Sequence, residues 1–176
     1  MENFTLKRLL IITGTPGTGK STVAKLVCNE LDLEHIDFHK IIEKDSILSA
    51  NFNKEKDCYD LDMDRVEELL KLKLEENPCK IMVFDTHVAQ HLPKEMILAA
   101  IVMRCSDLKI LEKRLLDRDY SVSKVKENLD SEIFDVCCDE AMELGVETFT
   151  FDSAQKIDEN EIITKLTEFF ASNNLF

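Results

Sequence analysis

The stretch Gly14-Thr15-Pro16-Gly17-Thr18-Gly19-Lys20-Ser21 fits the phosphate-binding pattern G-x-x-x-x-G-K-[ST]. An apolar run precedes it, and apolar residues at helical spacing follow it: Leu9 to Ile12 before, then Val23, Leu26, Val27 and Leu31. A strand, a tight loop and a helix in this order are the context that the pattern requires. The alternative is an accidental Gly/Thr turn, which this context disfavours. We therefore predict a loop that holds phosphates.

Each residue type in this loop has a physical role. The glycines Gly14, Gly17 and Gly19 let successive backbone N–H groups turn toward an anion without Cβ clashes. Lys20 offers a cation to the β- and γ-phosphates of a nucleotide, and the Ser21 hydroxyl is a ligand for Mg²⁺. The helix that follows presents its positive N-terminal end to the same anion.

Length, charge and hydropathy limit the classes of protein. A chain of 176 residues favours one domain, residues 1–176. It has no run of about 20 apolar residues, and its first residues lack the pattern of a signal peptide, so we expect a soluble intracellular protein without membrane contact. The net charge of −13 argues against direct DNA binding and favours basic partners, although an acidic surface can serve solubility alone.

The cysteines indicate neither a disulfide framework nor a zinc site. None of the six forms a C-x-x-C pair, and we expect reduced, mostly buried thiols at 28, 58, 79, 105, 137 and 138. Cys137 and Cys138 should point to different sides of a helix, which makes a bridge between them improbable.

Short apolar runs alternate with amphipathic segments along the whole chain. We predict strands at 6–12, 34–38, 81–84, 97–103 and 146–151, and helices at 20–31, 62–77, from Ser106, over 122–136 and at the C-terminus. An irregular acidic stretch is expected between residues 38 and 62. This alternation is typical of an α/β fold with a five-stranded parallel sheet covered by helices on both faces.

Ligands of such sheets collect beyond the carboxyl ends of the strands, where candidate catalytic residues follow. Asp85 ends an apolar run and can orient Mg²⁺ or its waters. His87 can hydrogen-bond a water, a phosphate or an acceptor, and a loop histidine with a backbone partner is its alternative. For His91 the two interpretations are about equal.

Phosphoryl transfer needs cations on the moving group, and a cluster of arginines follows the fourth predicted strand. Arg104, Arg114 and Arg118 lie in the right region, with Arg114 and Arg118 four residues apart on one predicted helical face. A mobile flap there would deliver Arg118, and with it Lys124, onto a bound nucleotide. The alternative is solvated charges that pair with neighbours such as Glu112 or Asp117.

Two other segments contain residues that could carry chemistry. A guanine-specific switch protein should show N-K-x-D, but the nearest match is Asn53-Lys54-Glu55-Lys56, with lysine in place of aspartate. The acidic run from Asp57 to Asp64 can contact an acceptor nucleoside or a cation, although a charged loop is more often merely solvated.

Several motifs together resemble one family. Besides the phosphate loop, these are D-C-x-x-L-D-x-D-R-V at 57–66, F-D-T-H at 84–87, R-L-x-x-R-x-Y at 114–120 and K-V-x-E-N-L-x-x-E-I-F at 124–134. They are similar to the adenylate kinase isoenzyme 6 family, the atypical nuclear adenylate kinase that is also described as a coilin-interacting nuclear ATPase. The resemblance extends from about residue 9 to residue 170.

The resemblance implies a nucleoside monophosphate kinase fold and its chemistry. An acceptor-binding region would span about residues 38–64 and a short lid about 115–125. The implied reaction is reversible transfer of the γ-phosphate of ATP to AMP or another nucleoside monophosphate with Mg²⁺, beside a slower ATPase activity. The resemblance also implies a role in maturation of the small ribosomal subunit through binding of a basic ribosomal protein. It further implies a monomer that is located in the nucleus and cytoplasm, or in the cytoplasm where the source has no nucleus.

By the same resemblance, site residues can be assigned. Phosphates are held by Gly14, Pro16, Gly17, Thr18, Gly19, Lys20, Ser21 and Thr22, with Arg118 and Lys124 as lid cations. Asp85 and His87 form the family's D-x-H motif; catalysis is assigned to Lys20, Asp85, His87 and Arg118, and metal binding to Ser21 and Asp85.

The chain departs from the family at two positions. Family members commonly have glycine after the lid arginine and an arginine in the acceptor region, where this chain has Asp119 and Glu43. Lys40 or Lys44 can replace the missing charge, but an ammonium does not reproduce a bidentate guanidinium contact, so AMP binding should be weaker.

Two further hypotheses remain open. One is an ATP-switched assembly factor that binds a basic ribosomal protein with little kinase activity, which Glu43 and the acidic charge favour. The other is a small-metabolite kinase on the same fold, which the family motifs disfavour.

Overall fold

A five-stranded parallel sheet forms the centre of the protein. The computed structural model describes residues 8–45, 52–53, 58–59, 62–76, 81–86 and 91–175. The strand order is β2-β5-β1-β6-β7, and every neighbouring pair in this sheet is parallel. The strands are β1 (Leu9–Thr13), β2 (Glu34–Asp37), β5 (Met82–Asp85), β6 (Ile97–Arg104) and β7 (Glu147–Asp152). The predicted α/β class with five parallel strands is confirmed.

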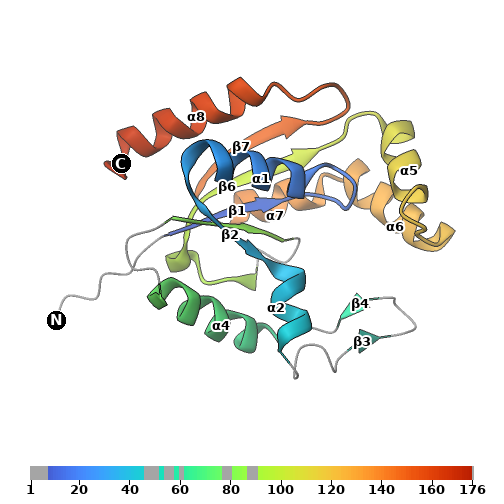
Figure 1. Ribbon diagram of the computed structural model, residues 1–176. Helices are drawn as coiled ribbons and strands as arrows, with labels where there is room; N and C mark the ends of the chain where they lie inside the picture. The colour runs from blue at the N-terminus through green and yellow to red at the C-terminus, as the bar shows by residue number, and fades with distance from the viewer. Residues whose placement is uncertain are drawn as a thin grey trace.

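The helices connect these strands and cover the sheet (Figure 1). They are α1 (Lys20–Leu31), α2 (Phe38–Lys44), α4 (Met63–Glu76), α5 (Leu108–Leu116), α6 (Val122–Ile133), α7 (Val136–Glu143) and α8 (Glu159–Ser172), with a short 3-10 turn, η2 (Lys94–Met96). Acidic side chains cap several of them, as their sequence positions suggest. Asp62 accepts a hydrogen bond from the backbone N–H of Arg65, and Asp107 accepts those of Lys109 and Ile110.

Two expectations about these elements are wrong. The segment 122–136 is not one helix, because α6 ends at Ile133 and Asp135 adopts a left-handed φ of 54° before α7 begins. The region after β2 is not wholly irregular. It contains α2, which Asp37 caps through the backbone N–H of Lys40, and a two-stranded antiparallel sheet of β3 (Phe52–Asn53) and β4 (Cys58–Tyr59).

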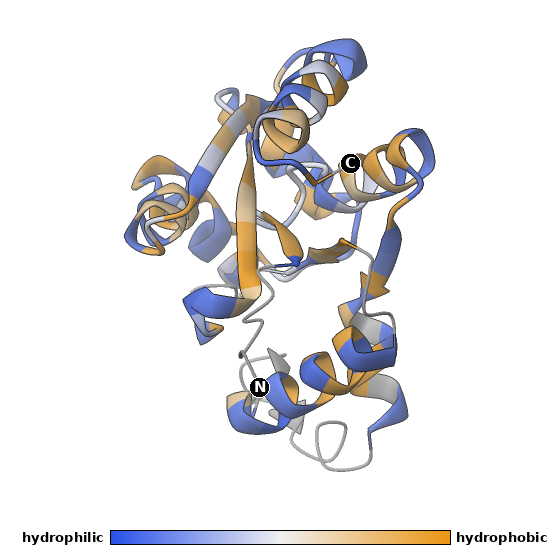
Figure 2. Cartoon of the chain, turned by 90° about the vertical axis from the view of Figure 1, so that its left-hand side faces the viewer, coloured by the Kyte–Doolittle hydropathy of each residue, from blue (hydrophilic) through white to orange (hydrophobic). Residues whose placement is uncertain are grey.

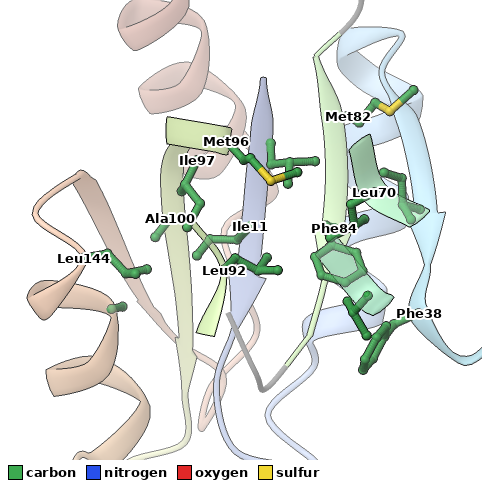
Figure 3. Close-up of a cluster of buried hydrophobic side chains, with 14 of the residues drawn as sticks. Ile11, Phe38, Leu70, Met82, Phe84, Leu92, Met96, Ile97, Ala100 and Leu144 are labelled. Carbon is green, nitrogen blue, oxygen red and sulfur yellow. The ribbon is translucent and has the colours of Figure 1, made fainter. Parts of the chain in front are cut away.

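The sheet is apolar on both faces because helices cover both. One face packs against α1 and α8 through Val23, Val27, Ile162, Leu166 and Phe170. The other packs against α2, α4 and α7, and Figure 3 shows Phe38, Leu70, Phe84 and Leu144 in that cluster. Colouring by hydropathy shows orange, apolar stretches in some strands of the sheet and blue, polar stretches in others (Figure 2). Burial on both faces explains why the inner strands β1, β5 and β6 are nearly continuous apolar runs, whereas the edge strands β2 and β7 contain polar residues.

A third, smaller cluster lies outside the sheet and connects helices α5 and α6 to it. Leu111 and Leu115 of α5 pack with Val125 of α6 and with Cys105, which directly follows β6. Free thiols are found at Cys28, Cys105, Cys137 and Cys138. No helix within the described segments is long and apolar enough to cross a membrane.

Candidate active site

The phosphate loop connects β1 to α1 in a conformation that needs glycine. Gly14, Gly17 and Gly19 have φ values of 137°, 89° and 96°. A Cβ on Gly14 would lie 2.1 Å from the carbonyl oxygen of Met103, so β6 closes against the loop at this point. The Thr18 hydroxyl donates to the carbonyl of Thr15 over 2.8 Å and tightens the turn.

The start of α1 is open toward this loop. Among the described residues, no side chain caps its first turn, and that turn contains no acidic residue. The positive end of the helix dipole thus faces the loop without a competing acidic side chain. Pro16 is half-buried in the loop, while Ser21 and Thr22 are exposed in the first turn.

Lys20 lies folded onto the loop. Its Nζ donates to the carbonyl of Gly14 over 2.7 Å and to that of Thr15 over 3.1 Å. Burial lowers the pKa of Lys20 from 10.5 to about 8, against the opposing effect of negative groups such as Asp85. A buried ammonium held by weak carbonyl contacts is ready to exchange them for phosphate oxygens, which carry full negative charge.

Asp85 meets two partners at the carboxyl end of β5. The Ser21 hydroxyl donates to its Oδ2 over 2.8 Å, and His35 Nε2 lies 2.9 Å from its Oδ1. A hydroxyl and a carboxylate are the oxygen ligands that Mg²⁺ accepts beside water and substrate phosphates. No group of three or more His, Cys, Asp or Glu residues that could hold a metal ion is found in the described segments. Ser21 and Asp85 therefore fit Mg²⁺.

The lid cations differ from one another in position. Arg118 is exposed in the turn after α5, and its charge contributes to the lowered pKa of Lys20, so the two lie within electrostatic reach. Because α5 ends at Leu116, Arg118 does not share a helical face with Arg114, and that expectation is wrong. Lys124, in the first turn of α6, lies 3.3 Å from the carboxylate of Glu127.

Arg114 bridges the phosphate loop and Ser153, which follows β7. Its Nη1 donates to the carbonyl of Gly17 over 3.3 Å and to the Ser153 hydroxyl over 2.9 Å, and its Nη2 donates to the Ser153 carbonyl over 2.7 Å. Neither Glu112 nor Asp117 is among these partners. Arg114 thus ties α5 to the phosphate loop and to the β7–α8 connection. Arg104 instead forms an ion pair with Asp135 between α6 and α7.

A cavity of about 570 Å³ lies along the edge strand β2, and His35, which borders it, contacts Asp85. Residues of β2, α2 and α4 line it, among them His35, Asp37, Lys40 and Lys44. Lys40 Nζ lies 3.3 Å from the carboxylate of Asp37. Although burial opposes it, hydrogen bonds from Lys40 hold the pKa of Asp37 below its ordinary value. Both lysines that can replace the missing arginine therefore face this cavity.

Some predicted residues lie elsewhere. His87 falls outside the described residues, as does the side chain of Glu43. His91 is exposed and lies near Glu140 of α7. Burial raises the pKa of Glu140, and the charge of His91 opposes this shift in part. Sequence reasoning missed His35 and the bridging role of Arg114, because both depend on which strands and loops become neighbours.

Comparison with known proteins now places the chain in a family. A family model for an AAA domain matches residues 10–135. The adenylate kinase isoenzyme 6 homolog of Schizosaccharomyces pombe is 37% identical over 134 residues, which are 76% of this chain and 74% of that protein. This chain belongs to the adenylate kinase isoenzyme 6 family. A putative adenylate kinase of Methanococcus maripaludis is 32% identical over 173 residues, 94% of this chain and 90% of the relative.

Solved structures extend the likeness of the fold. Shikimate kinase from Acinetobacter baumannii superposes with a TM-score of 0.64 at 16% identity and covers 98% of both chains. Deoxyadenosine kinase from M. mycoides with bound dATP superposes with a TM-score of 0.56 at 14% identity, over 91% of this chain and 99% of that one. At such low identity these neighbours show the fold alone, which is that of the P-loop kinases.

Proposed function

We propose that this protein is a Mg²⁺-dependent nucleoside monophosphate kinase that transfers the γ-phosphate of ATP to AMP and hydrolyses ATP slowly when no acceptor is bound. One observation carries the proposal. The Ser21 hydroxyl beside the phosphate loop meets Asp85, and His35, which also contacts Asp85, borders the cavity along β2. Membership in the adenylate kinase isoenzyme 6 family supports it.

The donor half follows from the phosphate loop. Backbone N–H groups of the loop and of the first turn of α1 bind the β- and γ-phosphates, and Lys20 leaves the carbonyls of Gly14 and Thr15 for the phosphate oxygens. Ser21 and Asp85 hold Mg²⁺ or its waters; the ion, when bound, neutralises phosphate charge and so lowers the barrier to transfer. Arg118 adds a cation from the lid as it closes.

The acceptor half rests on the cavity between β2, α2 and α4, which His35 borders. Its volume of about 570 Å³ lies within the usual range of small-ligand sites. Lys40 and Lys44 supply positive charge for an acceptor phosphate, in place of the arginine that the family commonly has near Glu43. His87 is assigned to the acceptor phosphate by the D-x-H motif. Because ammonium groups bind phosphate as point charges, we expect the KM for AMP to be high.

A coupled assay of ADP formation tests this proposal. ATP is offered alone and with each nucleoside monophosphate, and we expect AMP to raise the rate of ADP formation well above that of hydrolysis. Asp85→Asn should reduce both activities, since it weakens the metal site, whereas Lys109→Ala, an exposed change on α5, should alter neither. ADP formation at the same rate with and without AMP would show that kinase activity is not the main function.

We propose as a second function that ATP binding switches an association with a basic protein of the small ribosomal subunit. The net charge of −13 supports it, because an acidic surface attracts basic partners at long range. Pull-down with purified small-subunit proteins, with and without ATP, is the test. Nucleotide-sensitive capture of a basic protein is expected, and capture of none would count against this role.

A further inference from the structure

His35 is the residue of this site that no sequence motif indicates. It lies in the edge strand β2, and its Nε2 is 2.9 Å from Oδ1 of Asp85. Carboxylate oxygens accept and do not donate, so the imidazole Nε2–H is the donor. Both side chains are largely withdrawn from water, with 24% of His35 and 13% of Asp85 exposed. A charge-assisted hydrogen bond in such surroundings has a well-defined geometry.

The register of the sheet brings these two residues together. In the parallel pairing of β2 with β5, His35 lies opposite Val83 and Asp37 lies opposite Asp85. Side chains alternate along a strand, so His35, Val83 and Asp85 share the face of the sheet that α1 covers. His35 and Asp85 are diagonal neighbours on that face, a separation that a histidine ring spans. A shift of one residue in register would move His35 to the opposite face.

We propose that His35 is a positioning residue for Asp85, and this inference rests on the proposed Mg²⁺-dependent function. The imidazole holds Oδ1, so the carboxylate cannot rotate freely about its terminal bond. Its other oxygen, Oδ2, then points toward Ser21 and accepts a hydrogen bond from the Ser21 hydroxyl over 2.8 Å. The pair of oxygen ligands that meets the metal is therefore oriented before the nucleotide arrives.

The consequence is a preorganised metal site. A partner that orients a ligand residue typically contributes 10–100-fold in metal affinity, and we expect about tenfold because the nucleotide supplies most of the ligands. Without His35, water would take its place at Oδ1 and Asp85 would sample rotamers that face away from Ser21. If the His35 ring served only for packing, a variant with a ring of similar shape and no N–H donor would keep the metal affinity of the wild type.

Two substitutions separate orientation from packing. His35→Phe keeps the ring and removes the donor, whereas His35→Gln places an amide N–H near the position of Nε2. The readout is Mn²⁺ affinity of the enzyme–ATP complex, measured by electron paramagnetic resonance without an acceptor, because His35 also borders the cavity. We expect about tenfold weaker Mn²⁺ binding in His35→Phe and rescue to within about threefold in His35→Gln. ATP binding in the presence of a chelator should stay the same in both.

A double-mutant cycle completes the test. If His35 acts through Asp85, His35→Phe should add no further loss on an Asp85→Asn background. Should His35→Phe fold poorly, His35→Asn, whose amide is too short to reach Oδ1, takes its place. Mn²⁺ affinity equal to wild type in the donor-less variant, or equal losses in that variant and His35→Gln, would overturn the positioning role alone. A wild-type protein that binds no Mn²⁺–ATP would refute the proposed function together with this role.

Discussion

Single positions in the phosphate loop carry constraints of different strength, and Gly14 carries the strongest. Glycine adopts its φ of 137° readily, whereas other residues rarely do. An added Cβ would also lie 2.1 Å from a backbone oxygen of β6. Gly145 also has a positive φ, 66°, but an added Cβ would meet nothing within 4 Å. We expect Gly14→Ala to lower the free energy of unfolding by about 3 kcal/mol or more and Gly145→Ala by only about 1 kcal/mol.

Urea denaturation of both variants provides the measurement for this prediction. Equal losses would mean that β6 moves away from the loop and relieves the close contact, so that only the positive φ matters.

We expect Lys20 to make nucleotide binding dependent on pH. Its pKa is about 8 in the nucleotide-free protein because burial disfavours the charged form, and phosphate oxygens should raise it again. Nucleotide binding at about pH 8 should therefore take up roughly half a proton, and the uptake should fall toward zero at about pH 6.5, where Lys20 is already protonated. Calorimetry in buffers of different ionisation enthalpy measures it. Proton release at about pH 8, or uptake that does not change with pH, would contradict the assignment.

At the scale of elements, the sequence predicted the regular helices better than the breaks between them. Amphipathic spacing is a local property, so the apolar positions of α1, α4 and α8 are visible without the fold. The break between α6 and α7 depends on Asp135, whose left-handed backbone and ion pair with Arg104 are tertiary features. Helix α2 and the β3–β4 pair were missed because each is too short to show a period.

The lid turn after α5 gives a prediction at this scale. Asp119 has a φ of 59°, in the left-handed region that favours glycine. Asp119→Gly should therefore stabilise the protein by about 0.5–1 kcal/mol, since glycine adopts this conformation without a Cβ penalty. Asp117→Gly is the matched control. Its φ of −63° suits any residue, so the extra freedom of glycine in the unfolded chain should destabilise by a similar amount.

Thermal denaturation of the two variants decides between these signs. If both glycine variants were destabilised, the left-handed conformation of Asp119 would not be a source of strain. Aspartate instead of glycine at this position would then not lower the stability of the protein.

For the whole molecule, the net charge is the dominant global property. A charge of −13 on 176 residues repels itself in the compact state, and added salt screens that repulsion. Raising KCl from about 0.02 M to about 0.3 M should raise the Tm of the nucleotide-free protein by a few degrees. Differential scanning calorimetry measures the change. A Tm that falls with salt would mean that attractive ion pairs, such as Arg65 with Asp45, outweigh the general repulsion.

The sequence by itself determined the α/β class, the phosphate loop, Asp85 at a strand end and the family. These depend on local order along the chain: apolar period, glycine spacing and contiguous motifs. The tertiary structure alone decided that His35 meets Asp85, that Arg114 joins the phosphate loop to Ser153, and that Arg118 lies beyond the end of α5. These pairs are separated by tens of residues or by a helix end. Strand order and register bring these residues together. A pattern of neighbouring residues in the sequence does not contain that information.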